Sequence, residues 1–337
     1  NYGAPMYKFL LILTTCFLLP SAFAEDSLTE TKKLEMDSKA KMGWNYKLKF
    51  SSNIALSSSD NIIGQKSGDT KTLGLKINSG ANLKTINSEW RNSAKINLAS
   101  TKTPAVPFWV KSEDAFKYET IYLKQFENKP WLGPYVKASV EAPLLIGENK
   151  RDSNVEYQYS DGTSLGTKST QRLTDGFRPM TTKESLGLFA KAIDSKTKSL
   201  EFRVGLGAIQ VEAKDQLSLD DKDTTENIIE LKQLNSYSDL GVEMAMDYKG
   251  QWNKQSSYSL SMETLTPLST NKEDLPANLK EESSIRLTNV EIKFDVTTKV
   301  NEWLDLSYEY KASYQPKLLD EWQRQMGFVM SFSYAMF

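Results

Sequence analysis

The feature that most constrains the fold of this chain is an alternation of apolar and polar residues that begins at Trp44. Trp44, Tyr46 and Leu48 are apolar, and the residues between them are polar. Because neighbouring side chains of a β-strand point to opposite faces, this pattern predicts a strand with one apolar and one polar face. The alternation lasts for 13 residues, from Trp44 to Leu56, whereas the strands of globular proteins usually have about 5–6.

Similar alternating segments recur along the rest of the chain, and we count 12 in all. The later segments have apolar faces that begin at Leu73, Trp90, Val136, Leu200, Leu240, Tyr258, Val290, Leu304 and Phe328, and two weaker segments lie near 115–126 and 184–192. A long series of such strands is typical of a transmembrane β-barrel, in which one face of every strand meets lipid and the other faces the lumen.

The links between these strands separate a barrel from a soluble β-sandwich better than the strands do. Along the chain they cover roughly 57–72, 85–89, 100–114, 127–131, 147–183, 194–198, 212–237, 249–255, 267–284, 298–302 and 316–324. Long and short links alternate, apart from a shorter final long link, and a β-sandwich has no reason to keep that order. We therefore predict an all-β fold over 44–337: a transmembrane antiparallel up-and-down barrel of about 12 strands, with short periplasmic turns and long extracellular loops.

Tryptophan placement supports the same prediction. Five tryptophans fall at the short-turn ends of the predicted strands: Trp44, Trp90, Trp131, Trp252 and Trp303. In a barrel they would lie on one rim at headgroup depth, where an amphipathic ring is favoured, so we predict that they are membrane-interface aromatics. Tryptophans of a soluble core would show no such bias, although Trp109 and Trp322 depart from it.

Residues 1–24 have the pattern of a secretory signal peptide preceded by a few upstream residues. The apolar run from Phe9 to Leu19 has 11 residues, which is too short for a membrane-spanning helix. Ala22-Phe23-Ala24 follows it as a cleavage site, so we expect cleavage before Glu25. The alternative is a buried N-terminal helix. Residues 25–43 are polar, and we interpret them as a periplasmic lead-in to a barrel in the Gram-negative outer membrane.

Composition limits the chemistry that is open to the chain. It has no His, and its one cysteine, Cys16, lies inside the predicted leader. Ser-His-Asp and Cys-His catalysis and His-based metal sites are therefore excluded. Lys and Arg number 42 against 43 Asp and Glu, so no nucleic acid is expected as a partner. We predict that the chain is not an enzyme and takes no cofactor.

Two alternatives rest on carboxylates alone. Glu291 with Asp295, or Asp305 with Glu309, would stack on one strand face as an acid and a base, but such pairs are expected in any polar lumen. The acidic stretch Asp220-Asp221-Lys222-Asp223, with Glu226 nearby, is a candidate for calcium. It lacks a ligand spacing and a glycine turn, so a solvated acidic loop is favoured and no metal site is predicted.

If the apolar faces meet lipid, the alternate residues line the lumen and their charges separate by strand. The first three strands contribute basic residues and no acid: Lys47, Lys49, Lys76, Lys84, Arg91 and Lys95. Strands eight to eleven contribute mainly acidic residues: Asp239, Glu243, Asp247, Glu263, Glu291, Asp295, Asp305 and Glu309, offset in part by Lys249, Lys293 and Lys311. One arc of the lumen would then be positive and another negative, which predicts a transverse field.

The sequence leaves two functions open. The first is a small diffusion channel for polar or charged solutes, and the second is a barrel plugged by its own salt bridges, which acts as a structural or surface-interaction protein through its extracellular loops. A barrel of 12 strands lies between packed 8-stranded barrels and open 16-stranded porins in width. If the 147–183 link folds inward, it would close the pore or shape its constriction, and it carries Arg151, Asp152, Arg172, Asp175 and Arg178.

Three short stretches suggest a family resemblance over about Trp44 to Phe337. They are Gly68-Asp69-Thr70 before a strand, Ser185-Leu186-Gly187-Leu188 leading to Gly205-Leu206-Gly207, and Gln325-Met326-Gly327 before the last strand. The chain resembles bacterial outer-membrane β-barrel proteins and, more narrowly, uncharacterised families that include the salt-induced outer-membrane proteins. The resemblance implies a location and a fold and carries over no catalytic residue.

The expected partners follow from this location. They are outer-membrane lipid and the barrel-assembly machinery, which would bind the C-terminal strand ending in Phe337, and small polar solutes if the lumen is open. Phe337 is nevertheless out of phase with the outward residues Phe328 to Met336.

Overall fold

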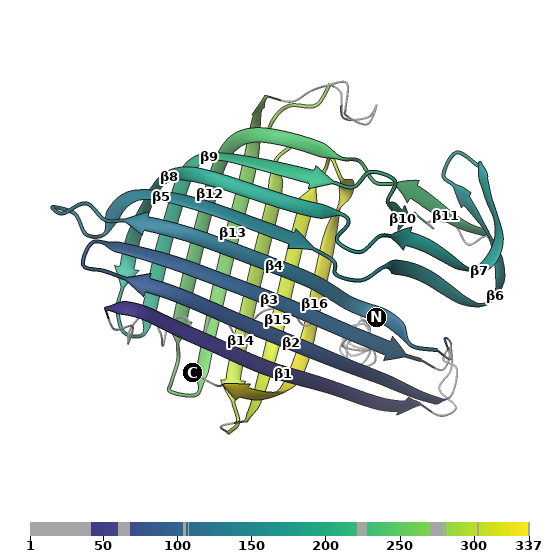
Figure 1. The fold of residues 1–337 in the computed structure, drawn as a ribbon, viewed down its shortest axis with the longest axis horizontal. Coiled ribbons are helices and arrows are strands. Elements are labelled where there is room, and N and C mark those ends of the chain that lie inside the picture. Colours follow the sequence, from purple (N-terminus) through teal and green to yellow (C-terminus); the bar gives the residue numbers. More distant parts are fainter. Residues whose placement is uncertain are drawn as a thin grey trace, which may run out of the picture.

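The computed structural model describes residues 42–59, 68–103, 106, 108–220, 228–269, 279, 281–301 and 303–335. A closed barrel is formed by β1 (Gly43–Ser59), β2 (Gly68–Lys84), β3 (Ser88–Lys102), β4 (Val110–Lys124), β5 (Leu132–Ala142), β8 (Met180–Asp194), β9 (Lys198–Glu212), β12 (Tyr237–Gln251), β13 (Ser256–Ser269), β14 (Asn289–Lys299), β15 (Leu304–Gln315) and β16 (Leu319–Ala335). These 12 strands pair antiparallel around the ring, and β1 pairs with β16 to close it (Figure 1). The predicted barrel fold is confirmed.

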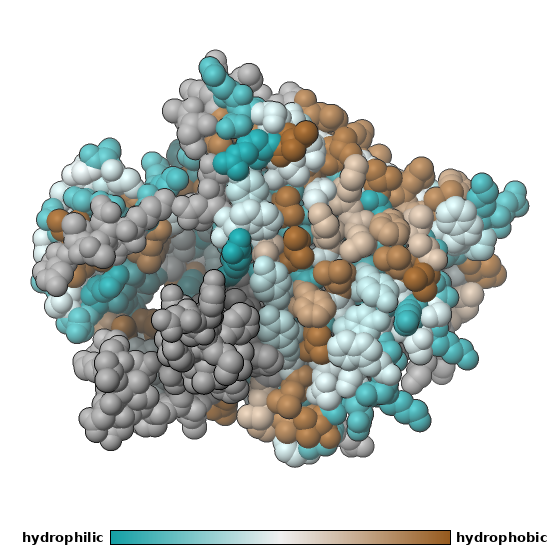
Figure 2. Space-filling view, turned by 180° about the vertical axis from the view of Figure 1, so that it is seen from behind, coloured by the Kyte–Doolittle hydropathy of each residue, from teal (hydrophilic) through white to brown (hydrophobic). Residues whose placement is uncertain are grey.

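The two-residue period of the sequence appears directly in the barrel wall. On β1, Trp44, Tyr46 and Phe50 are exposed, whereas the intervening Lys47 and Lys49 are buried. The polar residues therefore point into the lumen and the apolar ones outward. Figure 2 shows apolar and aromatic side chains over much of the visible wall, with hydrophilic side chains gathered toward the two ends.

The connections keep the predicted order of short and long, with one correction. Tight turns join β2 to β3, β4 to β5, β8 to β9, β12 to β13 and β14 to β15, and all of them lie at one end of the barrel (Figure 1). The predicted final link, 316–324, is wrong, because β16 begins at Leu319 and only 316–318 connect it to β15. Its first residues lack the alternation that marks the other strands, which is why the sequence places its start too late.

The 147–183 link does not fold into the lumen. Its middle forms β6 (Gly147–Tyr159) and β7 (Ser164–Thr174), which join β10 (Leu217–Leu219) and β11 (Ile228–Gln233) in a second sheet of order β10-β11-β6-β7. We call these four strands the accessory sheet. It projects beyond the barrel wall at the end opposite the tight turns (Figure 1), so the link extends the molecule and does not fill the barrel.

A small core of its own holds the accessory sheet together. Val155, Tyr157, Ile229 and Leu231 are buried against one another, because β11 pairs in parallel with β6 and brings two distant links side by side. Burial raises the pKa of Tyr157, and its hydroxyl donates a hydrogen bond of 2.9 Å to Asn149 Oδ1. The accessory sheet is thus a packed unit, in which apolar side chains exclude water from one face.

Two glycines of the stretches quoted above face each other in the barrel. Gly187 on β8 pairs in register with Gly205 on β9. A Cβ atom at Gly187 would collide with the carbonyl oxygen of Val204, and one at Gly205 with that of Leu186. The two backbones approach too closely here for any side chain, which is a physical reason for glycine at both positions.

Several predictions made for the chain ends lie outside the described residues: the signal peptide in 1–24, the lead-in up to residue 41, and the terminal Phe337. The same holds for 221–227, which include most of the acidic stretch considered for calcium. Within the described part of the chain, no helix is long and apolar enough to cross a membrane.

Candidate functional site: the barrel lumen

The basic residues predicted for the lumen do point inward. Lys47, Lys49 and Lys76 are buried, with Lys49 only 1% exposed, and Lys84, Arg91 and Lys95 are partly buried on the same inner face of β1 to β3. The expectation that this arc carries no acid is wrong, because β3 begins at Ser88 and places Glu89 inward beside Arg91. The alternating pattern predicts a strand that begins at Trp90, so the sequence alone does not place Glu89 in the lumen.

The acidic residues predicted for the opposite arc also face the interior. Asp239, Glu243, Asp295, Asp305 and Glu309 are buried on β12, β14 and β15. Asp247, Glu263 and Glu291 are partly buried on β12, β13 and β14. A row of carboxylates therefore lines one side of the lumen, as the alternation predicts.

The two arcs do not face each other across open water. Lys49 Nζ lies 2.8 Å from Asp305 Oδ2, and Lys76 Nζ lies 3.6 Å from Glu309 Oε2. Each pair joins a strand of the basic arc to β15 of the acidic arc. The charges that predicted a transverse field thus neutralise one another through direct contacts.

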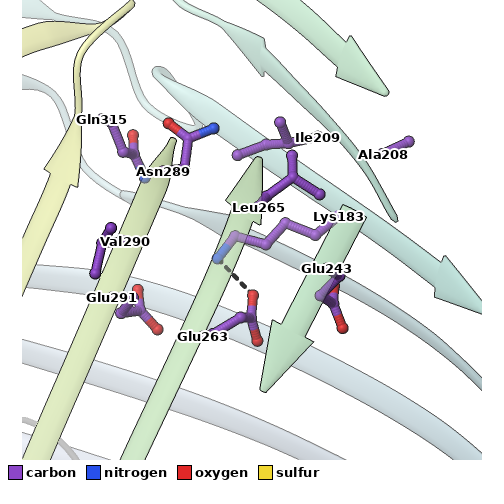
Figure 3. A pocket seen from close by; sticks show the side chains of 10 residues that line it. All are labelled: Lys183, Ala208, Ile209, Glu243, Glu263, Leu265, Asn289, Val290, Glu291 and Gln315. Carbon is purple, nitrogen blue, oxygen red and sulfur yellow. Dashed lines mark hydrogen bonds and ion pairs between the residues drawn. The ribbon is translucent and has the colours of Figure 1, made fainter. Parts of the chain in front are cut away.

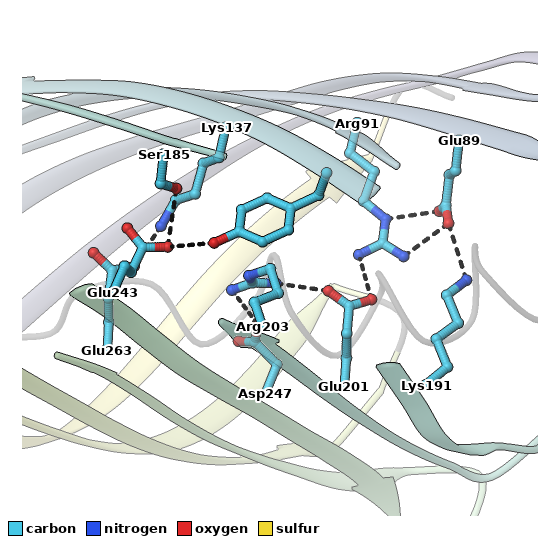
Figure 4. Close-up of polar contacts among 11 residues, drawn as sticks. Glu89, Arg91, Lys137, Ser185, Lys191, Glu201, Arg203, Glu243, Asp247 and Glu263 are labelled. Carbon is cyan, nitrogen blue, oxygen red and sulfur yellow. Dashed lines mark hydrogen bonds and ion pairs between the residues drawn. The ribbon is translucent and has the colours of Figure 1, made fainter. Parts of the chain in front are cut away.

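A second network of charges crosses the lumen between β3 and β9. The sequence does not predict this network. Arg91 contacts Glu89 at 2.7 Å and Glu201 at 3.2 Å, while Glu201 also contacts Arg203 at 2.6 Å. Lys191 completes this network through an ion pair with Glu89 at 3.2 Å (Figure 4). The same alternation that revealed the first arc marks Glu201 and Arg203, since each lies between outward apolar neighbours.

The middle of the lumen contains a third group of contacts, centred on two carboxylates. Glu263 binds Lys183 at 3.0 Å and also pairs with Lys137. Glu243 accepts hydrogen bonds from Tyr135 Oη at 3.2 Å and from Ser185 Oγ at 2.9 Å (Figure 4). These partners come from β5 and β8 and from β12 and β13, which have one to three strands between them in the ring, so the contacts link neighbouring parts of the barrel wall.

One ion pair joins opposite sides of the barrel. Lys311 Nζ on β15 lies 3.5 Å from Glu141 Oε1 on β5. In the ring order, five strands separate β15 from β5 in either direction. The two side chains therefore extend across the lumen and meet between opposite walls.

Two small cavities lie between the described side chains of the lumen. One cavity of about 20 Å³ lies among Lys183, Glu243, Glu263 and Glu291, below Asn289 (Figure 3). A second cavity of about 70 Å³, which we call the central chamber, lies nearer the middle of the lumen. Cavities of this size hold a few water molecules or one small ion.

Apolar clusters lie on the inner wall near both ends of the lumen. Ile121, Leu123, Tyr135 and Phe189 pack together toward the tight-turn end. Toward the other end, Ile209, Val211, Ala213, Tyr237 and Leu265 form a second cluster, against which Leu318 packs. Leu318 belongs to the connection between β15 and β16, so that turn folds inward over the mouth of the barrel.

Lys317, in the same turn, is a residue whose role the sequence did not predict. Its side chain is 3% exposed, its ammonium group pairs with Asp239, and it lies 5.9 Å above the ring of Tyr237. Asp239 and Tyr237 belong to β12, which is separated from β15 by two strands of the ring. The pair therefore ties the turn across the mouth. No local signal in the sequence distinguishes Lys317 from other loop lysines.

The five tryptophans predicted for one rim do lie there. Trp44, Trp90, Trp131, Trp252 and Trp303 are all exposed near the tight-turn end of the barrel. Trp44 packs against Trp90 with ring centres 5.8 Å apart, and Trp303 stacks on Phe332. Trp109 and Trp322 are exposed near the other end. Their contact with a membrane interface stays a prediction.

The described residues contain no group of three or more acidic or cysteine side chains placed to hold a metal ion. The lumen offers instead a dense set of paired charges. Such an arrangement links strands that are not neighbours in the ring.

No protein-family model and no curated protein matches the chain. Among solved structures, the translocator domain of the autotransporter NalP from Neisseria meningitidis is 9% identical, with a TM-score of 0.35 over 91% of this chain and 95% of that one. An outer membrane channel from Pseudomonas putida F1 is 6% identical, with a TM-score of 0.37 over 88% and 95%. A FadL homologue of Pseudomonas aeruginosa is 8% identical, with a TM-score of 0.31 over 94% and 93%.

Likeness at this level carries no argument about function. The narrower resemblance to the salt-induced outer-membrane proteins stays a prediction. What the chain does must be argued from its own geometry.

Proposed function

We propose that this protein is an outer-membrane barrel whose lumen is closed to solutes and which holds the accessory sheet at the cell surface as an interaction module. An even number of strands, an outward apolar wall and tryptophans gathered near the tight turns support a membrane location. The tight turns would face the periplasm, so the accessory sheet, at the opposite end, would face the outside. No residue is assigned a catalytic role.

A single observation carries the closed lumen: the ion pair between Lys311 and Glu141 on opposite sides of the ring. Both partners would have to separate before a solute could pass. The apolar clusters at the two ends and the buried Lys317–Asp239 pair close the same path again. A barrel with three successive closures is suited to anchoring a surface module.

Conductance in a planar lipid bilayer tests the proposal. We expect the wild-type protein to show no stepwise current, because the lumen contacts are direct. Replacing Lys76, Glu141 and Lys311 together by Ser shortens the side chains that cross the lumen and should produce discrete steps. A control with Lys196→Ser and Lys254→Ser, at exposed short turns, should stay silent. Steps from the wild-type protein would contradict the closed lumen.

A small diffusion channel for polar or charged solutes is the second candidate. The observation in its favour is that, among the residues that the structure describes, only side chains cross the middle of the lumen, and that the central chamber is lined mainly by charged groups. If the wild-type protein conducts, changing Lys47, Lys49 and Arg91 together to Glu should shift the reversal potential toward cation selectivity. An unchanged reversal potential would remove these residues from the conducting path.

A further inference from the structure

A recess of about 700 Å³ lies on the outer wall of the barrel, close to the end that carries the tight turns. It lies over β1, β2, β3 and β4, which are neighbours in the ring (Figure 1). Ligand sites in proteins usually have about 300–1,000 Å³, so the recess is large enough for part of a ligand molecule. We call it the wall groove.

The pairing register of these four strands explains why the wall is hollow here. The floor of the groove has short outward side chains on β2 and β3, namely Ser79, Ala81, Asn92 and Ala94. Bulky outward side chains surround this floor in the same and adjacent rows: Trp44, Leu83, Trp90 and Tyr122 toward the tight turns, Tyr46 and Leu48 on β1, Tyr118 on β4, and Phe50, Ile77, Ile96 and Phe116 on the far side. Short side chains enclosed by long ones leave a recess that a narrow chain can enter.

The wall groove begins one row of outward residues away from the tryptophan rim. Trp44 and Trp90 border it on the side of the tight turns, with ring centres 5.8 Å apart. Two residues along a tilted strand advance by about 5 Å toward the middle of a membrane. With the tryptophans at headgroup depth, the groove would lie where glycerol esters and the first part of the acyl chains are found. This placement rests on the membrane location proposed above.

A hydrogen-bonded network of polar side chains lies at the edge of the groove. Trp90 Nε1 donates to Thr120 Oγ1 at 2.8 Å. Asn92 Oδ1 accepts from Thr120 Oγ1 at 2.8 Å and from Tyr118 Oη at 3.2 Å. Polar groups that face lipid need such partners, because the hydrocarbon region holds no water to replace them.

The same network leaves one donor over. The side-chain nitrogen of Asn92 carries two hydrogens and donates one of them to the backbone oxygen of Ala81 at 3.0 Å. Within the part of the chain that the structure describes, the second hydrogen is used in no hydrogen bond. Since Asn92 lines the groove, an acceptor on a molecule bound there would satisfy it.

We propose that the wall groove binds one phospholipid of the periplasmic leaflet. An acyl chain of this lipid fills the recess over Ser79, Ala81 and Ala94, and an ester carbonyl accepts the hydrogen bond from Asn92. A single flexible chain can reach the floor of the recess. The convex wall of a second barrel would instead meet the bulky residues around it, so a second copy fits less well.

Native mass spectrometry of the full chain, extracted in mild detergent, tests the occupant. We expect the wild-type protein to retain one phospholipid, and Ala94→Phe to lose it, because the ring fills the floor of the groove. Ala190→Phe is the matched control, since Ala190 lies on β8 next to the inward Phe189 and outside the groove. It should retain the lipid. Both variants should keep heat-modifiable migration on gels, because the new rings point away from the lumen.

Two results would overturn the proposal. The first is equal lipid retention in Ala94→Phe and the wild type. The second is a dimer that Ala94→Phe abolishes, since the groove would then hold a second copy. A barrel that inserts into vesicles and gives either result would overturn the lipid site alone, whereas a chain that does not insert would overturn the membrane location as well.

The hydrogen bond from Asn92 is tested by lipid chemistry. Dipalmitoyl phosphatidylethanolamine and its diether analogue share a headgroup and chain length, but only the first has ester carbonyls. Titrated into delipidated wild-type protein, the ester lipid should bind about fivefold more tightly, as expected for one neutral hydrogen bond. Asn92→Leu should bind the two lipids equally. An ester preference that persists in Asn92→Leu would contradict the role of Asn92.

Discussion

At the scale of single residues, Lys317 forms a buried ion pair that the sequence does not predict. A lysine in a three-residue connection is ordinarily solvated, yet this one is buried against Tyr237 and pairs with Asp239. Removing one partner of a buried pair leaves an uncompensated charge, which typically costs about 3–5 kcal/mol, whereas replacing both by apolar residues is often neutral.

We therefore expect Lys317→Met to lower the free energy of unfolding by about 3 kcal/mol. The double variant Lys317→Met with Asp239→Leu should recover most of that loss, because no charge is left in the closed mouth. Urea unfolding followed by tryptophan fluorescence would measure both. Lys254→Met, at an exposed turn, is the matched control and should stay within about 0.5 kcal/mol of the wild type. A double variant as unstable as the single one would show that the pair does not act as a unit.

At the scale of elements, the accessory sheet shows which strands a local sequence pattern predicts and which it does not. The strands of the barrel are long enough to show their period, but β10 has only 3 residues and β11 has 6. The pairing of β11 with β6 joins residues about 70 positions apart, for example Ile229 with Tyr157. Nothing local in either link encodes a partner in the other.

We expect that the accessory sheet can unfold while the barrel stays folded, because the apolar core of the sheet is separate from the barrel. Leu231 has no exposed surface in that core, and Leu231→Ala should destabilise the sheet by about 2–5 kcal/mol. We expect faster proteolysis within 147–174 in reconstituted vesicles, while the barrel keeps its heat-modifiable migration on gels. Leu219→Ala, at a residue that is 47% exposed in the same sheet, should be cleaved like the wild type. Loss of heat-modifiability in Leu231→Ala would mean that the two units fold together.

At the scale of the whole molecule, the mean hydropathy of −0.49 is a consequence of the architecture. A barrel exposes only alternate residues on its outer wall, so its average composition resembles that of a soluble protein. The same geometry gathers the residues at one end of each strand into a rim, although they are far apart in the chain. We therefore expect the rim tryptophans to form a single belt at one depth in the membrane.

Depth-dependent fluorescence quenching tests this belt. In variants that retain one tryptophan each, with the others changed to Phe, lipids brominated near the headgroup should quench Trp44, Trp131 and Trp303 to a similar extent. Quenching should weaken for all three as the bromine moves toward the end of the acyl chain. Brominated lipids that quench the three residues at clearly different depths would show that they do not share one interface.

The sequence by itself determined the number of barrel strands, the face on which each side chain lies and the end at which the tight turns gather. These follow from a period of two residues and from link lengths, both of which are local. It did not reveal Glu89, whose strand begins before the first apolar residue, nor the early start of β16 at Leu319.

Only the tertiary structure decided how the inward charges meet. The two opposed arcs of the sequence become direct pairs such as Lys49–Asp305 and Lys76–Glu309. Whether inward side chains touch or leave a pore depends on the width and cross-section of the closed ring. That geometry arises from the pairing of all 12 strands at once, and no stretch of sequence contains it.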